Sequence, residues 1–249
     1  MDANVEQSLA ALHLRHINGV FADNIEEGRQ KILSLIPLDA VVGIGDSTAL
    51  RQMGLPQVLR ERGTKVLDAF DTQEQKTYPK DAGDRHTRIV REATVSDVFL
   101  TGTNAITQDG RLVNVDAVGN RVAGMVWGHP LSIVVVGRNK IVRDLDEAFH
   151  RIRNVIAPNH ARIRSVELGG EKMKTPCVKT GECSDCRTTD RICNVFTIVE
   201  GKPFFTDLTV VIVNEDLGLS WDTSWPASRI TTIIEEYKKF VWLPPGNDR

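Results

Sequence analysis

Residues 132–137 read SIVVVG, a short and continuous apolar run in which no charged residue interrupts the apolar ones. Such a run is typical of a strand that is buried on both faces of a sheet. Comparable runs predict further strands at residues 40–45, 65–70, 96–101, 195–199 and 209–213. Because amphipathic segments separate several of these runs, the pattern predicts an α/β fold with a mostly parallel sheet and helices on both of its faces.

Helices are predicted where apolar residues recur at helical spacing, most clearly from Ile141 to Ile156. Others are predicted within residues 6–36 as two segments, from Ser47 or Thr48 to about residue 62, and at residues 72–93 and 228–240. We expect four parts of the chain: a helical N-terminal segment (1–36), an α/β core (37–157), an irregular cysteine-rich, metal-binding insertion (158–194), and strands and a helix that complete the core (195–249).

The composition is that of an ordinary globular protein. The 249 residues are 41% hydrophobic and 26% charged, and the formal net charge of -2 gives no electrostatic reason to expect nucleic acid as a partner. No apolar stretch approaches the roughly 20 residues that cross a bilayer. The N-terminus also lacks the basic start and apolar run of a secretion signal. We therefore expect a cytoplasmic protein without a membrane span.

All four cysteines lie in the stretch TPCVKTGECSDCRTTDRICN, with the spacing Cys177-x5-Cys183-x2-Cys186-x6-Cys193. In a reducing compartment, so tight a group is more often metal-binding or redox-active than a disulfide framework. Thiolates select iron–sulfur clusters, zinc or copper(I) over hard cations. We predict an iron–sulfur cluster of the 4Fe-4S type. A structural zinc site and a redox-active set without metal are the alternatives.

The number of cysteine ligands bears on the chemistry. If all four bind, electron transfer or structural support is the expected role. If Cys183, Cys186 and Cys193 alone bind a 4Fe-4S cluster, one iron stays open for substrate. Basic residues in the same stretch would offset the negative charge of the thiolates, namely Lys179, Arg187 and Arg191.

The loop after the first core strand reads GIGDSTALRQMG (residues 43–54) and combines glycines with small polar residues. Glycines let a ligand approach the backbone, and the amides of a helix N-terminus bind anions. This pattern predicts binding of a small anionic substrate, a hydroxy acid or sugar phosphate, by Gly43, Gly45, Asp46, Ser47 and Thr48. The alternative is a plain strand-to-helix turn with a Ser or Thr cap.

A second polar segment, residues 101–124, follows another predicted strand. Hairpin turns at Asp109-Gly110 and Gly119-Asn120 would explain part of it. They do not explain the polar residues at strand ends, where open α/β sheets bind ligands. The candidates in and near this segment are Thr103, Asn104, Asn114, Asp116, Asn120, His129 and Lys140.

Two of these candidates lie beside the 132–137 strand and have separate interpretations. Lys140 follows it, and its charge would neutralise a substrate carboxylate or phosphate. His129 precedes it in the sequence WGHP, where a catalytic role and a structural role beside the tryptophan are both open.

Four stretches together resemble the LUD (lactate-utilisation) domain family, in the subgroup that carries a four-cysteine motif: LSLIPLDAVVGIGDSTALRQMG, FLTGTNAITQDGRLVNVDAVGNRVAG, VVVGRNKIVRDLDEAFHRI and TPCVKTGECSDCRTTDRICN. They run from about Asn24 to Asn194, and a looser tail continues to Val213. The resemblance implies a fold similar to the sugar-phosphate isomerase and CoA-transferase superfamily.

Within that superfamily, TNAITQDGRLVN is similar to a motif of isomerases related to methylthioribose-phosphate isomerase. The residue that corresponds to Asn104 is an acidic catalytic group there. An amide cannot take up and return a proton at neutral pH as a carboxylate can. The resemblance therefore implies that Asn104 orients the substrate and that Asp116 stands in as the acid.

Three functions fit these observations. The first is an iron–sulfur protein of small hydroxy- or keto-acid metabolism that works by electron transfer with redox partner subunits or by cluster-assisted catalysis. The second is a sugar-phosphate or carboxylate isomerase or transferase with a structural zinc. The third is a non-catalytic ligand-binding or assembly subunit. A homo-oligomer is a further expectation.

Overall fold

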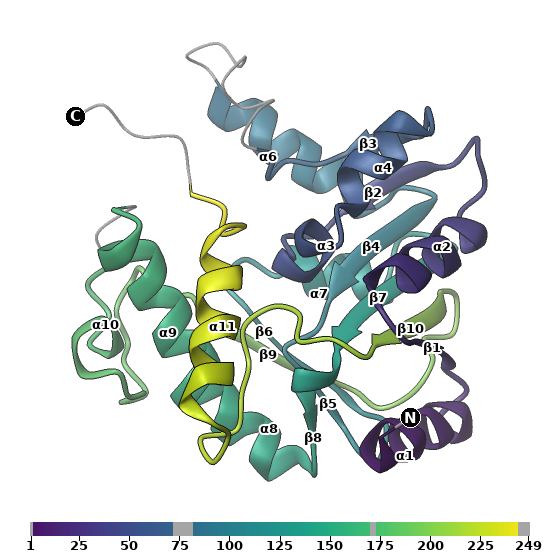
Figure 1. Cartoon of the computed structure of the whole chain (residues 1–249). Helices are drawn as coiled ribbons and strands as arrows, with labels where there is room; N and C mark the ends of the chain where they lie inside the picture. The colour runs from purple at the N-terminus through teal and green to yellow at the C-terminus, as the bar shows by residue number, and fades with distance from the viewer. Residues whose placement is uncertain (1, 72–81, 170–172, 244–249) are drawn as a thin grey trace.

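A six-stranded sheet, parallel throughout, forms the centre of the computed structural model, which describes residues 2–71, 82–169 and 173–243 (Figure 1). The strand order is β1 (Asn18–Ala22), β10 (Asp207–Val213), β7 (Leu131–Gly137), β4 (Val98–Gly102), β2 (Val41–Ile44) and β3 (Lys65–Leu67). Every neighbouring pair in this sheet is parallel, which confirms the predicted α/β fold class.

Helices cover both faces of this sheet, and strand β7 shows why. Ile133 and Val135 point into one apolar core, whereas Val134 and Val136 point into the other. The first core is closed by α2 (Ile25–Leu35), α3 (Thr48–Gln52) and α4 (Leu55–Glu61). The second is closed by α1 (Ala3–Leu14), α7 (Asn120–Val126) and a second sheet. Helix α6 (Ala82–Ala93) packs on β2, β3 and α7.

The second sheet is mixed and was not predicted from the sequence. Its order is β8 (Ile141–Val142), β5 (Ala105–Thr107), β6 (Leu112–Asp116) and β9 (Val195–Val199). Strands β5 and β6 form an antiparallel hairpin whose turn contains Gly110 at φ +87°, as the Asp109-Gly110 pair predicts. The prediction of a hairpin turn at Gly119-Asn120 was wrong, because Gly119 precedes α7 and leads into a helix.

The N-terminal segment is not helical throughout. Residues 18–22 form β1, which pairs with β10, about 190 positions further along the chain, in the register Asn18↔Thr209 to Ala22↔Val213. This correction to the predicted helical segment has a tertiary cause. The edge of β10 offers backbone hydrogen bonds that a local sequence pattern does not reveal.

One long helix links the two sheets to the cysteine-rich stretch. It consists of α8 (Leu145–Arg151), the π-helical turn η2 (Ile152–Ile156), α9 (Ala157–Arg162) and the π-helical turn η3 (Ile163–Glu167). We expected an irregular chain from residue 158, but the helix continues past Pro158. A π-helical turn directly before the proline widens the helix where the ring would otherwise meet the preceding carbonyl groups.

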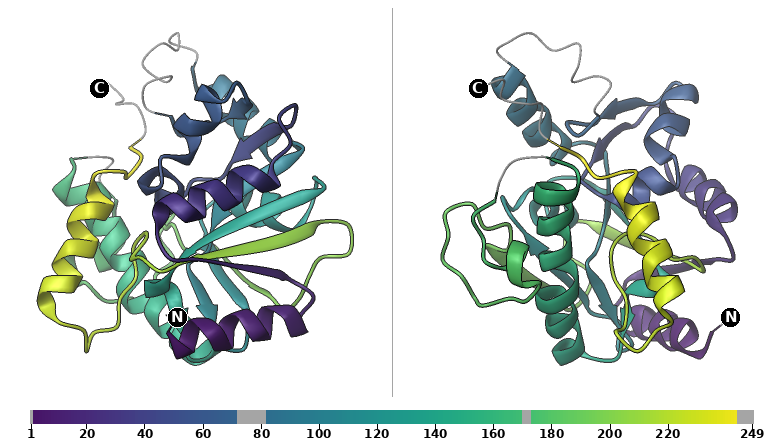
Figure 2. Two further views of the ribbon diagram at one scale, coloured as in Figure 1. Left: turned by 45° about the vertical axis from the view of Figure 1, so that its right-hand side comes forward. Right: turned by 60° about the vertical axis from the view of Figure 1, so that its left-hand side comes forward.

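The C-terminal helix α11 (Ala227–Lys238) packs beside this long helix, as both views of Figure 2 show. A separate apolar cluster joins the two helices and includes Val155, Ile163, Ile233 and Tyr237. Beyond the long helix lies the short α10 (Cys177–Thr180), and the chain from there to β9 has no regular structure. Within the described residues, no helix is long and apolar enough to span a membrane.

Substitution of Gly43 should destabilise the fold, because β2 passes very close to the end of α6. A Cβ atom at this position would lie 2.2 Å from the carbonyl oxygen of Ala93. We expect Gly43→Ala to lower the free energy of unfolding by about 1–3 kcal/mol in urea denaturation. Gly201→Ala is the control, because its Cβ would meet only the Arg15 carbonyl, at 3.3 Å. Equal stability of the two variants would contradict this interpretation.

Candidate active site and cysteine site

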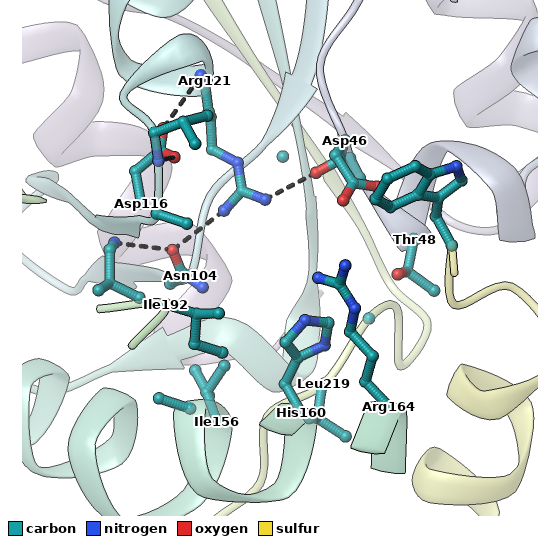
Figure 3. A pocket seen from close by; sticks show the side chains of 18 of the residues that line it. Asp46, Thr48, Asn104, Asp116, Arg121, Ile156, His160, Arg164, Ile192 and Leu219 are labelled. Atoms are coloured by element: carbon teal, nitrogen blue, oxygen red, sulfur yellow. Dashed lines mark hydrogen bonds between the residues drawn. The ribbon is translucent and has the colours of Figure 1, made fainter. Parts of the chain in front are cut away.

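A cavity of about 540 Å³ lies at the carboxyl ends of β2 and β4, between the second sheet, the long helix and α11 (Figure 3). This is the edge at which parallel α/β sheets bind ligands, because the loops after neighbouring strands meet there. Eight predicted site residues line the cavity: Asp46, Ser47, Thr48, Thr103, Asn104, Asp116, Asn120 and Lys140. The sequence therefore predicted most of the residues that form one wall of this cavity.

The opposite wall comes from parts of the chain that the sequence analysis did not connect with the site: His160 belongs to α9, Arg164 to η3 and Tyr237 to α11. Arg121 of α7 lies on the first wall, within the second polar segment of the sequence, but was not itself among the predicted site residues. A signal for two of them was present, because His160 and Arg164 are four residues apart, as on one face of a helix. The expectation of an irregular chain after Pro158 hid that spacing.

Arg121 ties three polar loops together. Its Nη2 donates a hydrogen bond to the backbone carbonyl of Asp46 at 2.6 Å, and its Nη1 donates to Asn104 Oδ1 at 3.2 Å (Figure 3). The same Asn104 oxygen accepts the backbone N–H of Val115 at 2.9 Å. The predicted orienting residue Asn104 therefore positions an arginine, and through it the cavity wall, by a route that the sequence does not show.

Arg164 brings a second guanidinium into the cavity, and its position is unusual. Its Cζ lies 5.3 Å from the centre of the Trp242 ring, a cation–π contact. Its Nε is buried without a hydrogen-bond partner, and no hydrogen bond or ion pair of this side chain is present among the described residues. Arg121 Nε is likewise buried without a partner. Two guanidiniums in one cavity thus retain capacity to bind an anion.

Two groups in the cavity have shifted pKa values. Burial, together with the nearby charge of Arg121, lowers the pKa of Lys140 to about 7, while its Nζ donates to the Thr103 carbonyl at 2.8 Å. Loss of solvent raises the pKa of the Asp46 carboxyl, although Arg121, Arg51 and Arg164 oppose the rise. Shifts of this kind are characteristic of functional sites.

His160 and Tyr237 form a third polar feature of the cavity. His160 Nδ1 and the Tyr237 hydroxyl share a hydrogen bond of 2.6 Å. Burial lowers the pKa of His160 to about 4, and it raises the pKa of Tyr237. Both groups are therefore neutral at pH 7, so that the positive charge in the cavity comes from the arginines and from Lys140.

Asp116 has a structural position, although it lies at the cavity wall. Its Oδ1 accepts the backbone N–H of Val118 at 3.1 Å. Its Oδ2 accepts the backbone N–H groups of Arg121 and Val122 at 3.0 and 3.3 Å. Both oxygens thus hold the turn that begins α7, as a capping carboxylate does. This geometry leaves Asp46 as the better-placed carboxylate for proton transfer.

Four predicted site residues lie outside the cavity lining. Gly43 and Gly45 allow close packing, because a Cβ atom at Gly45 would lie 2.8 Å from Thr101 Oγ1. Asn114 is fully buried and donates to Met125 Sδ at 3.7 Å. His129 is buried against Phe99, with ring centres 5.6 Å apart, and burial lowers its pKa. The structural interpretation of His129 therefore fits its surroundings.

The four cysteines gather at a second, smaller cavity on the far side of α9. Cys177, Cys183, Cys186 and Cys193 all line it, and none of them forms a disulfide. Burial and the proximity of the other three cysteines raise the pKa of Cys177. Within the described residues, no three His, Cys, Asp or Glu side chains are close enough to hold one metal ion.

The two cavities share a wall. Ala157 of α9 and Ile192 line both of them. Arg191 lines the large cavity, and its Nη2 also lies 3.0 Å from the Cys193 carbonyl and 3.5 Å from Cys193 Sγ. Its Nη1 donates to the Cys186 carbonyl. One guanidinium therefore connects the cysteine loop with the large cavity.

A model of the LUD domain matches residues 5–213, which is most of the chain and includes every strand of the two sheets described above. The chain belongs to the LUD domain family. No curated protein matches this LUD protein. Among solved structures, it is similar to a DUF162 family protein from Deinococcus radiodurans, with 15% identity and a TM-score of 0.44 over 84% of this chain and 96% of that one.

Ribose 5 phosphate isomerase A from Neisseria gonorrhoeae is also similar, with 12% identity and a TM-score of 0.30 over 58% of this chain and 65% of that one. Both similarities are too distant to support an argument about the site of the LUD protein. Its chemistry is therefore argued from its own residues.

Removal of the Asp116 carboxylate should affect stability, because three backbone amides would lose their acceptor. We expect Asp116→Ala to lower the free energy of unfolding by about 1–3 kcal/mol, and Asp116→Asn, which keeps one acceptor oxygen, to lower it less. Urea denaturation followed by circular dichroism measures both. If Asp116→Ala were as stable as the unmodified protein, the capping role would be wrong.

Lys140 should make stability depend on pH. The unfolded chain holds its proton up to the ordinary pKa of 10.5, whereas the folded protein releases it near 7. Between these values the unfolded state binds more protons, so stability rises with pH. Relative to Lys140→Met, the free energy of unfolding of the unmodified protein should rise by roughly 2–4 kcal/mol from pH 7 to pH 10. Lys65→Met is the control, because Lys65 is exposed. If the difference in free energy of unfolding between the unmodified protein and Lys140→Met did not change with pH, the lowered pKa of Lys140 would be wrong.

Proposed function

We propose that this LUD protein holds an iron–sulfur cluster of the 4Fe-4S type through its four cysteines and acts on a small hydroxy or keto acid bound in the large cavity. The observation that carries the proposal is the shared wall: Ala157 and Ile192 separate a four-cysteine cavity from a cavity with underused arginines. A redox group and an organic anion would then be neighbours.

The donor set fits such a cluster. Four soft thiols line one small cavity, and thiolates are the usual ligands of iron–sulfur centres, although in this conformation no three of the described side chains are close enough to hold one metal ion. Arg153 lines the same cavity and Arg191 lies 3.5 Å from Cys193 Sγ, so that both charges would offset those of the thiolates. The cavity of about 20 Å³ is smaller than a cluster, so binding requires an outward movement of the irregular, solvent-exposed loop that carries Cys183 and Cys186.

The residues of the large cavity would bind and orient the acid. Arg121 and Arg164 supply the positive charge for its carboxylate, and guanidiniums match that group geometrically. Asp46, with its raised pKa, would take up the proton released from the hydroxyl or the neighbouring carbon. Lys140, with a pKa of about 7, would stabilise developing negative charge on the oxygen. Oxidation of the hydroxy acid to the keto acid releases two electrons and two protons, so a cluster in the cysteine site would pass the electrons one at a time to a redox partner subunit, while the second proton would leave to solvent.

A second candidate, a sugar-phosphate or carboxylate isomerase or transferase with a structural zinc, is favoured by the pair Asp46 and Lys140. A carboxylate and an amine in one cavity suit proton transfer without an electron acceptor. The third candidate, a non-catalytic ligand-binding or assembly subunit, would bind the acid without turnover. Metal analysis separates the first two, and exchange of the acid's α-hydrogen with deuterated solvent identifies proton transfer.

Iron and acid-labile sulfide in anaerobically purified protein test the cluster directly. We expect a brown protein with broad absorption near about 400 nm, and loss of most of the iron and sulfide in Cys186→Ser. Ser184→Ala is the matched control, because Ser184 lines the same cavity without a thiol. Stoichiometric zinc without sulfide would contradict the iron–sulfur assignment.

Asn104→Ala separates the two sites, because Asn104 holds Arg121 and lies in the large cavity lining. This variant should keep its iron and sulfide but bind the acid more weakly in calorimetry. Loss of the cluster in Asn104→Ala would show that the large cavity and the cysteine site are not independent.

A further inference from the structure

The large cavity is roomy for a lactate-sized acid. Its volume of about 540 Å³ falls in the range of roughly 300–1,000 Å³ that is typical of sites for much larger ligands. A three-carbon acid held by one arginine would leave most of that space to water. Proteins do not usually keep apolar side chains around so large a space unless a ligand covers them.

Part of the wall is apolar, and it faces the polar groups. Ile156, Ile192 and Leu219 lie along one side of the cavity, opposite the Asp46 loop (Figure 3). Trp242, which follows α11, adds an aromatic surface to the lining. A ligand with an apolar body would bury these side chains, and lactate would not reach most of them.

Trp242 is held in a defined orientation. Its ring stacks on His86 with centres 5.3 Å apart and an interplanar angle of 16°, and it meets Phe70 edge-on at 5.3 Å. These contacts bring together a residue from α6, a residue after β3 and a residue after α11. A side chain held in this way can contact an apolar ligand at its cavity-lining surface with little cost in conformational entropy.

The two guanidiniums of the cavity lie close to this aromatic surface. Arg164 contacts the Trp242 face and has a buried Nε without a partner. Arg121 approaches from the other side, so that the two guanidiniums face the same space from opposite elements (Figure 3). A carboxylate between them would leave the rest of the ligand near Trp242 and the apolar side.

We propose that the ligand is a 2-hydroxy or 2-oxo acid with a bulky apolar side chain, best an aromatic one. Its carboxylate binds Arg121 and Arg164, and its ring lies against Trp242 and the side formed by Ile156 and Leu219. The inference rests on the proposed function for the hydroxy or keto acid, and it adds the size and chemistry of the group that the acid carries.

Calorimetry of the unmodified protein with a series of acids of increasing side-chain size tests the inference. The probes are lactate, 2-hydroxybutyrate, 2-hydroxy-4-methylpentanoate and 3-phenyllactate, which share one head group. We expect the affinity to rise along this series, with 3-phenyllactate at least about tenfold tighter than lactate because it buries an aromatic ring. Equal affinities, or tighter binding of lactate, would overturn the inference.

Two variants locate the two ends of the ligand. Arg164→Gln should weaken all four acids by a similar factor, because it removes charge from the common head group. Trp242→Leu should weaken 3-phenyllactate by a larger factor than lactate, because lactate meets Trp242 only through its contact with Arg164. Trp127→Leu is the matched control, because Trp127 is exposed and outside the cavity lining. Equal loss of both acids in Trp242→Leu would overturn the aromatic contact.

The outcomes separate this inference from the proposed function. If none of the acids binds, the proposed function itself fails, and this inference fails with it. If lactate binds and the apolar side chains add nothing, the proposed function stands and the inference is wrong. The acid series needs no correctly folded variant, so instability of Trp242→Leu does not affect it.

Discussion

Strand β7 has no solvent-exposed face, and this constraint organises the molecule. Its alternate residues fill two apolar cores, and its neighbours β10 and β4 pair with it in the same direction. Because all six strands of the sheet are parallel, their carboxyl ends meet at one edge. The loops after β2 and β4 therefore lie together there, although the two strands end 58 positions apart in the sequence. The position of the large cavity follows from the burial of one strand.

The cavity depends on charge as much as on shape. Burial of a guanidinium without a full set of partners is costly, and proteins rarely retain such groups without a role. Arg121 is held by Asn104 and the Asp46 carbonyl, yet its Nε lacks a partner, and so does that of Arg164. Asp46 offsets some of this charge. An organic anion would offset the charge of both guanidiniums, and this supports the proposal that a substrate binds between them.

The long helix lies between the two candidate sites. Ala157 lies on it between the cavities, and its π-helical turns present Ile156 and Arg164 to the large cavity. Arg191, whose guanidinium contacts the cysteine loop, lines the large cavity from the other side of this wall.

The sequence by itself determined the fold class, the strands of the central sheet except β1, the loop of Asp46 and the grouping of the four cysteines. These features depend on local apolar runs and on spacing along the chain, which any reader of the sequence can see. Tertiary structure alone decided that residues 18–22 form a strand, that Asp116 caps α7 and that His129 lies in the core. It also brought Arg121, Arg164 and Trp242 to one cavity. The physical reason is that strand pairing, burial and charge compensation between distant segments produce no local pattern in the sequence. These interactions can therefore be recognised only in the folded chain.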